Sequence, residues 1–73
     1  MKNFVFDSPV VLQPSMMSIR TAEEATSVLR THLQSRFTMA GLSALLMLER
    51  ALDRSECDEA RDVFHSWAAS ERV

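Results

Sequence analysis

The sequence predicts a small α+β domain in which an N-terminal β-hairpin packs on three α-helices, in the order ββααα. Residues 1–20 hold short segments rich in Val, Ile and Phe, separated by Pro and Ser, which suits extended structure. Residues 21–70 hold three segments in which apolar residues recur every three or four positions, as on one face of a helix. With 73 residues and 47% apolar content, residues 1–73 are expected to form one domain rather than a disordered chain.

The extended part is interpreted as a hairpin in which Pro9–Gln13 pairs with Met16–Arg20. Pro14 fits the second position of a type I turn between them, because its ring presets φ. The preceding segment, Asn3–Phe6, is interpreted either as a third extended segment or as a mobile tail.

The first helix is predicted from about Ala22 to Leu33 or Ser35. Its start, Thr21-Ala22-Glu23-Glu24, has the pattern of a capping box. The Thr21 hydroxyl can accept from the Glu24 amide, and the Glu24 side chain can reach back to the Thr21 amide. One face then carries apolar residues and one histidine at the spacing of a helix: Ala25, Val28, Leu29, His32 and Leu33.

The second helix is predicted to begin near Thr38, which can cap it, and to run to about Arg54. Apolar residues cover most of its circumference up to Leu48, which predicts the most buried helix of the domain. Gly41 costs roughly 1 kcal/mol relative to Ala inside a helix, and its small size suits a close crossing of two helices.

The third helix is predicted from a cap at Ser55 to about Ser70, with acidic residues in its first turn. Its apolar stripe continues without a break through Cys57, Ala60, Val63, Phe64, Trp67 and Ala68.

Few residues suggest chemistry, and each has a simpler structural interpretation. Cys57 lies among acids on the apolar stripe, which favours a buried thiol over a reactive one. His65 lies about 12 Å further along the same helix, so the two cannot share a metal. His32 is interpreted as a boundary residue with a hydrogen-bond partner. We therefore expect no catalytic, cofactor-binding or metal-binding residue, and no enzyme.

The charged residues bear on a second hypothesis, that the protein is a small regulator that binds nucleic acid. The chain has eight Lys or Arg against ten Asp or Glu, for a net charge of −2, so a nucleic-acid partner is not the first expectation. Arg20, Arg30 and Arg36 could still form a phosphate-binding patch of a small regulator. A third hypothesis is a small-molecule sensor with its pocket between the hairpin and the second helix.

Size argues for a partner. A core this small rarely supplies more than roughly 3–5 kcal/mol, and one cysteine allows no intrachain disulfide. We therefore expect a homodimer with a shared four-stranded sheet, formed at an open strand edge. The interface residues would be Val11, Met16, Met17 and Ile19, and a charge at Val11 or Ile19 should then abolish assembly. The alternative is a monomer whose edge is covered by Asn3–Phe6.

Location is inferred from what the sequence lacks. No stretch approaches the roughly 18 apolar residues of a membrane-spanning helix, and Asp7 and Pro9 interrupt any secretory signal. The single cysteine fits a reducing compartment. We expect a cytoplasmic protein with no membrane partner.

Several short motifs carry a resemblance to a known family. They are Pro9-Val10-Val11-Leu12, Glu24-Ala25 at a helix start, and Ala60-Arg61 followed by Phe64. In these motifs, and over about residues 8–70, the chain resembles the domain-of-unknown-function 982 family of small alphaproteobacterial proteins. It departs from the family pattern in having Pro14-Ser15 at the turn instead of Gly. It also lacks the family's tryptophan after the first helix and its cysteine in the middle helix. The resemblance implies a small bacterial protein of uncharacterised activity and brings no catalytic residue. The expected role is a non-enzymatic interaction or accessory module, with an unidentified protein as a further partner.

Overall fold

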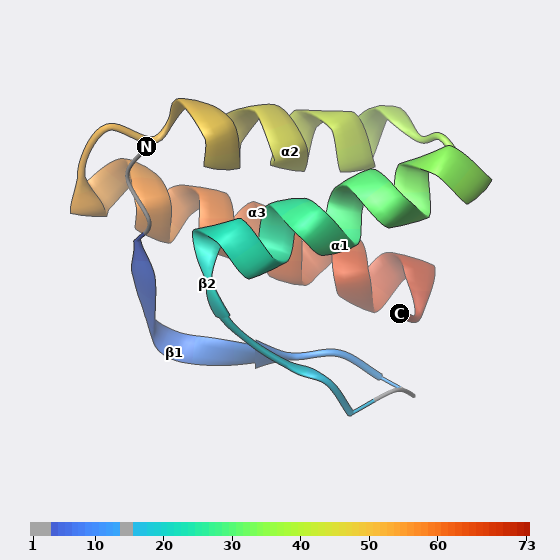
Figure 1. The fold of residues 1–73 in the computed structure, drawn as a ribbon, viewed down its shortest axis with the longest axis horizontal. Helices are drawn as coiled ribbons and strands as arrows, with labels where there is room; N and C mark the ends of the chain where they lie inside the picture. The colour runs from blue at the N-terminus through green and yellow to red at the C-terminus, as the bar shows by residue number, and fades with distance from the viewer. Residues whose placement is uncertain (1–3, 14–15) are drawn as a thin grey trace.

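The computed structural model describes residues 4–13 and 16–73, which form a two-stranded antiparallel sheet followed by three helices (Figure 1). The elements are β1 (Val5–Val11), β2 (Ser18–Thr21), α1 (Ala22–Ser35), α2 (Met39–Arg50) and α3 (Arg54–Glu71). The hairpin lies on one side of the molecule and α2 on the opposite side, with α1 and α3 between them. The predicted α+β fold in the order ββααα is confirmed.

The first strand is longer than predicted and irregular in its middle. Val5 and Phe6 belong to β1 itself, so the described part of the Asn3–Phe6 segment is neither a third strand nor a tail. Pro9 lies within the irregular stretch, a position where a residue without an N–H is tolerated. The turn residues Pro14 and Ser15, and Asn3, lie outside the described residues. The paired residues are Val5 with Thr21, Val10 with Ile19, and Val11 with Ser18.

The start of α1 confirms half of the predicted capping box. The Thr21 hydroxyl accepts from the Glu24 amide at 3.1 Å. The Glu24 side chain, however, accepts from the amide of Arg20 at 2.9 Å, and not from that of Thr21 as predicted. The reason is that β2 runs into α1 without a loop, which leaves the Arg20 amide on the outer side of the strand within reach of Glu24.

The boundary between the second and third helices differs from the prediction. Thr38 caps α2 as expected, but the helix ends at Arg50 and not near Arg54. The cap of α3 is Asp53, whose carboxylate accepts from the Glu56 amide at 2.9 Å, and not Ser55. Both residue types cap helices well. Asp53 has this role because the chain between α2 and α3 leaves the helical conformation at Ala51.

The central helix is α3, and the prediction that the second helix is the most buried is wrong. Helix α3 packs against α1, α2 and β1, whereas α2 packs against α1 and α3 and forms the outer layer away from the hairpin. Helix α3 is therefore in contact with more elements of the fold than α2 is. Among the described residues, 15 buried hydrophobic residues form the core, and no charged residue is buried with them: Phe6, Val10, Leu12, Ile19, Ala22, Ala25, Leu29, Ala44, Leu48, Ala51, Cys57, Ala60, Phe64, Trp67 and Ala68.

Gly41 lies where three helices meet. A Cβ at this position would lie 2.9 Å from Leu33 Cδ2 on α1 and 2.9 Å from Trp67 Nε1 on α3. The indole N–H of Trp67 is buried and has no hydrogen-bond partner among the described residues. The ring is held between Phe64, stacked at 5.8 Å between centroids, and His32, edge-on at 5.1 Å. The predicted close crossing at Gly41 is confirmed.

Replacing Gly41 with alanine is expected to destabilise the fold, although helix propensity alone favours alanine by roughly 1 kcal/mol. Overpacking in a tight core costs roughly 1–3 kcal/mol, because the held Trp67 ring must shift. We expect a net loss of about 1 kcal/mol, measured by urea unfolding. The matched control is Ser66→Ala, at an exposed position of α3 outside this crossing, which should leave stability equal or slightly raised. A stabilised G41A variant would contradict this account.

Candidate interaction surfaces

The residues that suggested chemistry are not gathered by the fold. Cys57 is a fully buried residue of the core, and His65 is exposed on the same helix. Within the described residues, no group of three or more His, Cys, Asp or Glu side chains is placed to hold a metal ion. No helix in the described parts of the chain combines the length and apolar character that crossing a bilayer requires.

His32 has the boundary position and the hydrogen-bond partner that were predicted. Its Nε2 lies 3.4 Å from Oε1 of Glu71, and the same oxygen lies 3.4 Å from Nε of Arg36. The Glu71 carboxylate is largely buried between these two groups. The cluster ties the end of α1 to the last turn of α3, which is a structural role.

The three arginines proposed for phosphate binding are mostly engaged with acids. Arg30 pairs with Glu49 of α2 at 3.0 Å, and Arg36 contacts Glu71. Arg20 is exposed on β2, at the other end of α1 from Arg36. The structure therefore separates these residues and partly neutralises them. The nucleic-acid hypothesis stays a prediction that this geometry weakens.

The residues predicted for a dimer interface divide into two groups. Val11, Met16 and Met17 have exposed side chains around the end of the hairpin, and we name these three residues the hairpin surface. Ile19, in contrast, is only 2% exposed because its side chain faces the helices. A second copy could contact the hairpin surface but could not reach Ile19.

The outer edge of β1 is largely closed by the chain itself. Arg54 of α3 donates a hydrogen bond to the carbonyl of Val5, and Arg61 donates to the carbonyl of Ser8 at 2.7 Å. Further along, the amide of Gln13 donates to the carbonyl of Val73 at 2.8 Å. Such coverage is a common way to prevent strand pairing between molecules.

The outer edge of β2 is short and also partly covered. Its Arg20 amide already donates to Glu24. The strand has only four residues and leads directly into α1. With both edges reduced in this way, a shared four-stranded sheet has little free backbone to pair with, and the expectation of such a sheet loses support.

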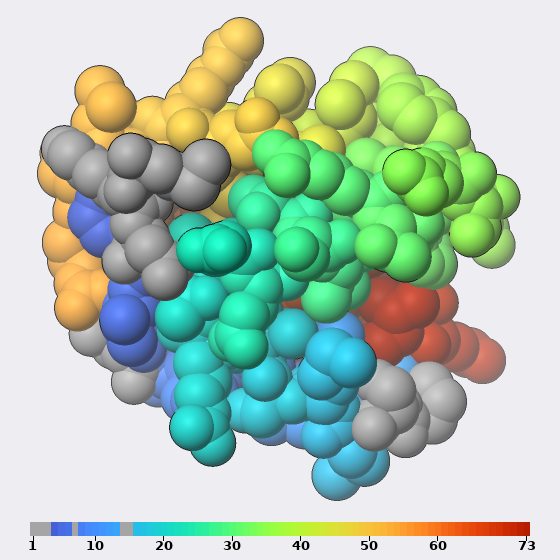
Figure 2. Space-filling view, viewed as in Figure 1, coloured from blue at the N-terminus to red at the C-terminus, as the bar shows by residue number. Residues whose placement is uncertain are grey.

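A second exposed apolar surface lies on α2. Met39, Leu42 and Leu46 are spaced three and four residues apart, so they follow one line along the helix with Ser43 beside it. Met39 is 72% exposed, Leu46 is 39% exposed and Leu42 is half-buried. We name Met39, Leu42, Ser43 and Leu46 the α2 face. Figure 2 shows α2 along the upper rim of the molecule, on the side away from the hairpin.

The residues that flank α2 are exposed as well. Phe37 precedes the helix and Leu52 follows it, and both are among the most exposed large apolar side chains of the described chain. The nearest charges along the chain are Arg36, just before Phe37, and Glu49 and Arg50 in the last turn of α2. Sequence reasoning missed this surface because it assigned the all-round apolar character of the helix to burial. The sequence did hold a signal for an exposed apolar surface. The helix is apolar all round, and a chain of this length is too small to bury every side of a helix.

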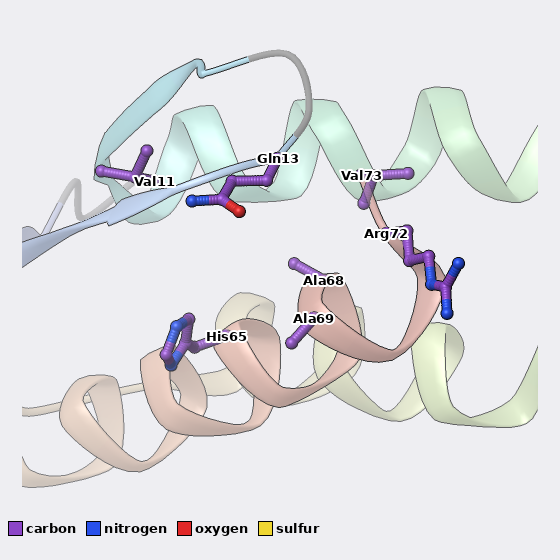
Figure 3. Close-up of a pocket in the computed structure, with 7 residues that line it drawn as sticks. All are labelled: Val11, Gln13, His65, Ala68, Ala69, Arg72 and Val73. Carbon is purple, nitrogen blue, oxygen red and sulfur yellow. The ribbon is translucent and has the colours of Figure 1, made fainter.

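A pocket lies between the hairpin and α3, and not between the hairpin and the second helix as the sensor hypothesis expected (Figure 3). Its volume is about 590 Å³. Ala68 and Ala69 lie on its α3 side, with His65 and Arg72 on the same segment, and the hairpin supplies Val11 and Gln13. In Figure 3 the His65 and Arg72 side chains spread apart and do not converge on one point. The sensor hypothesis therefore stays a prediction without a defined ligand geometry.

Comparison with known proteins gives no relative: no family model, no curated protein and no solved structure matches this chain. The resemblance to the domain-of-unknown-function 982 family accordingly stays a prediction.

Proposed function

We propose that this protein is a non-enzymatic interaction module of the cytoplasm that acts as a homodimer. The observation that carries the proposal is the α2 face, where Met39 and Leu46 are exposed and Leu42 is half-buried along one side of the helix. Burying a leucine or methionine side chain fully contributes roughly 1.5–3 kcal/mol. That is a large gain for a domain whose own core supplies only a few kcal/mol.

A second copy is favoured as the occupant because a domain of 73 residues with one cysteine, and with no metal-binding cluster among its described residues, commonly gains stability by oligomerising. A standard interface buries about 800 Å² on each partner. This is about one-sixth of the 4785 Å² that the chain exposes, so one face of the molecule suffices. The hairpin surface, on the other side of the molecule, then remains available to a different protein partner.

The test is the mass of the protein in solution, measured by light scattering and sedimentation over a range of concentrations. We expect a dimer for the natural sequence. Met39→Lys and Leu46→Lys should each raise the dissociation constant at least tenfold, because a charge would have to be buried between the copies. Both positions are exposed in a single copy, so the circular dichroism spectrum should not change.

Two control variants locate the interface. Thr31→Lys, on the exposed side of α1, should leave the dimer intact. Met17→Lys tests the hairpin surface, which the sequence had suggested. A dimer that Met17→Lys dissociates and Met39→Lys leaves intact would move the interface to the hairpin. A monomer at every concentration would refute the homodimer itself.

A further inference from the structure

We infer that the pocket between the hairpin and α3 binds an extended acidic segment of a partner protein, which pairs with the outer edge of β1 at Val11. The site lies between the hairpin and α3, whereas α2 forms the opposite side of the molecule (Figure 1). The inference therefore goes beyond the proposed homodimer and does not depend on it. It rests on the backbone of Val11, on the shape of the pocket and on the charge of the pocket wall.

The backbone of Val11 points away from β2. In an antiparallel ladder, pairs of residues that exchange hydrogen bonds alternate with pairs that do not. Leu12 donates to the carbonyl of Met17 at 2.8 Å, so its neighbour Val11, opposite Ser18, belongs to a pair without such bonds. The N–H and C=O of Val11 therefore face the outer edge of β1, where the described residues provide no hydrogen-bond partner for them.

The same edge is already bound on either side of Val11. The amide of Gln13 donates to the carbonyl of Val73 at 2.8 Å, and Arg61 donates to the carbonyl of Ser8. The contact of Gln13 with Val73 shows that a chain segment can approach this edge closely enough for main-chain pairing. The stretch between the two contacts borders the pocket. A peptide that adds a strand there gains main-chain hydrogen bonds, which is a recurrent mode of peptide recognition.

The α3 wall of the pocket suits an extended ligand. Arg72 directly follows α3 and comes seven residues after His65, which places it roughly 10.5 Å further along the helix axis. An extended chain rises about 3.3 Å per residue, so roughly three residues span this distance. Ala68 and Ala69 lie between the two, and their small side chains leave room for a peptide. The His65 and Arg72 side chains spread apart in Figure 3, which favours an extended segment over a single small anion.

The charge of the pocket favours acidic residues in the ligand. Its lining includes Arg72 and His65 but no Asp or Glu. Neither of these two side chains has an ion-pair partner among the described residues, whereas Arg30, Arg36 and Arg61 each contact an acid. A carboxylate of the ligand beside Arg72 would form a charge-assisted contact that the fold itself does not supply.

The test is an NMR titration of the isotope-labelled full chain with the synthetic peptide acetyl-Glu-Val-Glu-Val-Glu-amide, whose alternation places its acids on one face of a strand. We expect saturable binding with a Kd below about 1 mM and a shift of the Val11 amide resonance. The Val10 amide, which faces Ile19 inside the sheet, is the internal control and should shift less. The same peptide with lysine in place of glutamate should bind weaker by roughly tenfold or more, because like charges meet.

A third peptide separates strand pairing from charge attraction. It keeps all three glutamates, but its backbone nitrogens are methylated, so it cannot donate to the carbonyl of Val11. We expect it to bind weaker than the unmodified peptide by roughly tenfold or more, because the main-chain hydrogen bonds supply affinity in this mode of recognition.

Two variants locate the site on the protein. Ala69→Glu adds an acid at an exposed position of the pocket, so the chain should fold as before and bind the acidic peptide weaker by roughly tenfold or more. Arg72→Gln should weaken binding roughly two- to fivefold, as expected for an exposed ion pair. Arg50→Gln removes an exposed arginine of α2 and is the matched control, which should leave the affinity unchanged.

Binding that shifts Val11 and is lost in A69E supports the inference. It is overturned if the acidic peptide does not bind at about 1 mM, or if the lysine peptide or the methylated peptide binds equally well. Shifts confined to α2 would overturn it as well. The homodimer is tested separately by mass in solution, so a failure of peptide binding leaves the proposed function standing.

Discussion

Replacing Phe64 with alanine is expected to leave most of the chain unfolded at room temperature. Phe64 is fully buried on α3, the helix that contacts α1, α2 and β1, and its ring stacks on Trp67. Removing a buried phenylalanine ring costs roughly 3–5 kcal/mol, through lost transfer free energy and the cavity that remains. A core of this size supplies about the same amount, so little net stability remains. Circular dichroism and urea titration measure the result.

Two further variants keep this prediction falsifiable. Phe64→Leu keeps an apolar side chain in the site and should fold with a loss of roughly 1–2 kcal/mol. His65→Ala, at the exposed neighbouring position, should unfold at nearly the same urea concentration as the natural sequence. All chains must be compared at one concentration, because dimer formation adds to apparent stability. A fully folded F64A variant would show that α3 is not the centre of the core.

Replacing Ile19 with lysine is expected to unfold the domain rather than to dissociate a dimer. Ile19 is buried against the helices within a single copy, with no buried charged residue near it among the described core residues. An ammonium group there would lose its water without gaining a partner, which costs several kcal/mol. This exceeds what the small core can offset. The measurement is the loss of helical circular dichroism and of a cooperative thermal transition.

The neighbouring Val11→Lys variant is the matched comparison. Val11 lies opposite Ser18 in the same hairpin, but its side chain is 47% exposed. The fold and the mass in solution should both remain unchanged, since the lysine stays in water and the α2 face is untouched. Loss of the dimer in folded V11K would instead support the hairpin surface as the interface.

Local signals predicted the elements well. The Thr21–Glu24 pattern and the apolar stripe that follows it placed α1 correctly to within its predicted limits, because capping and helical periodicity depend on residues close in sequence. The same holds for the stripe of α3, whose predicted members all lie in or beside the core. The α3 cap was misplaced by two positions, because Asp53 and Ser55 are equally good caps and only the course of the preceding chain selects one.

Long-range contacts decided what local signals could not. The sequence showed that the hairpin had edges, but not that Arg54 and Arg61 would cover one of them from more than 40 residues away. It showed that the second helix is apolar all round, but periodicity cannot say which side of such a helix meets its neighbours. The candidate interface on α2 was therefore missed, and Ile19 was assigned to an interface although it belongs to the core.

The sequence by itself determined the order of the elements and the apolar stripes of the helices. It also indicated that a chain of 73 residues with one cysteine needs stabilisation by a partner. These follow from spacing, capping and surface-to-volume arithmetic, which need no knowledge of the partners of each residue. The tertiary structure decided which helix is central and which apolar side chains remain in water. It placed α3 between the hairpin and α2, and one helix cannot occupy the centre without displacing another to the surface. The apolar outer side of α2 results from that placement, and it carries the proposed function.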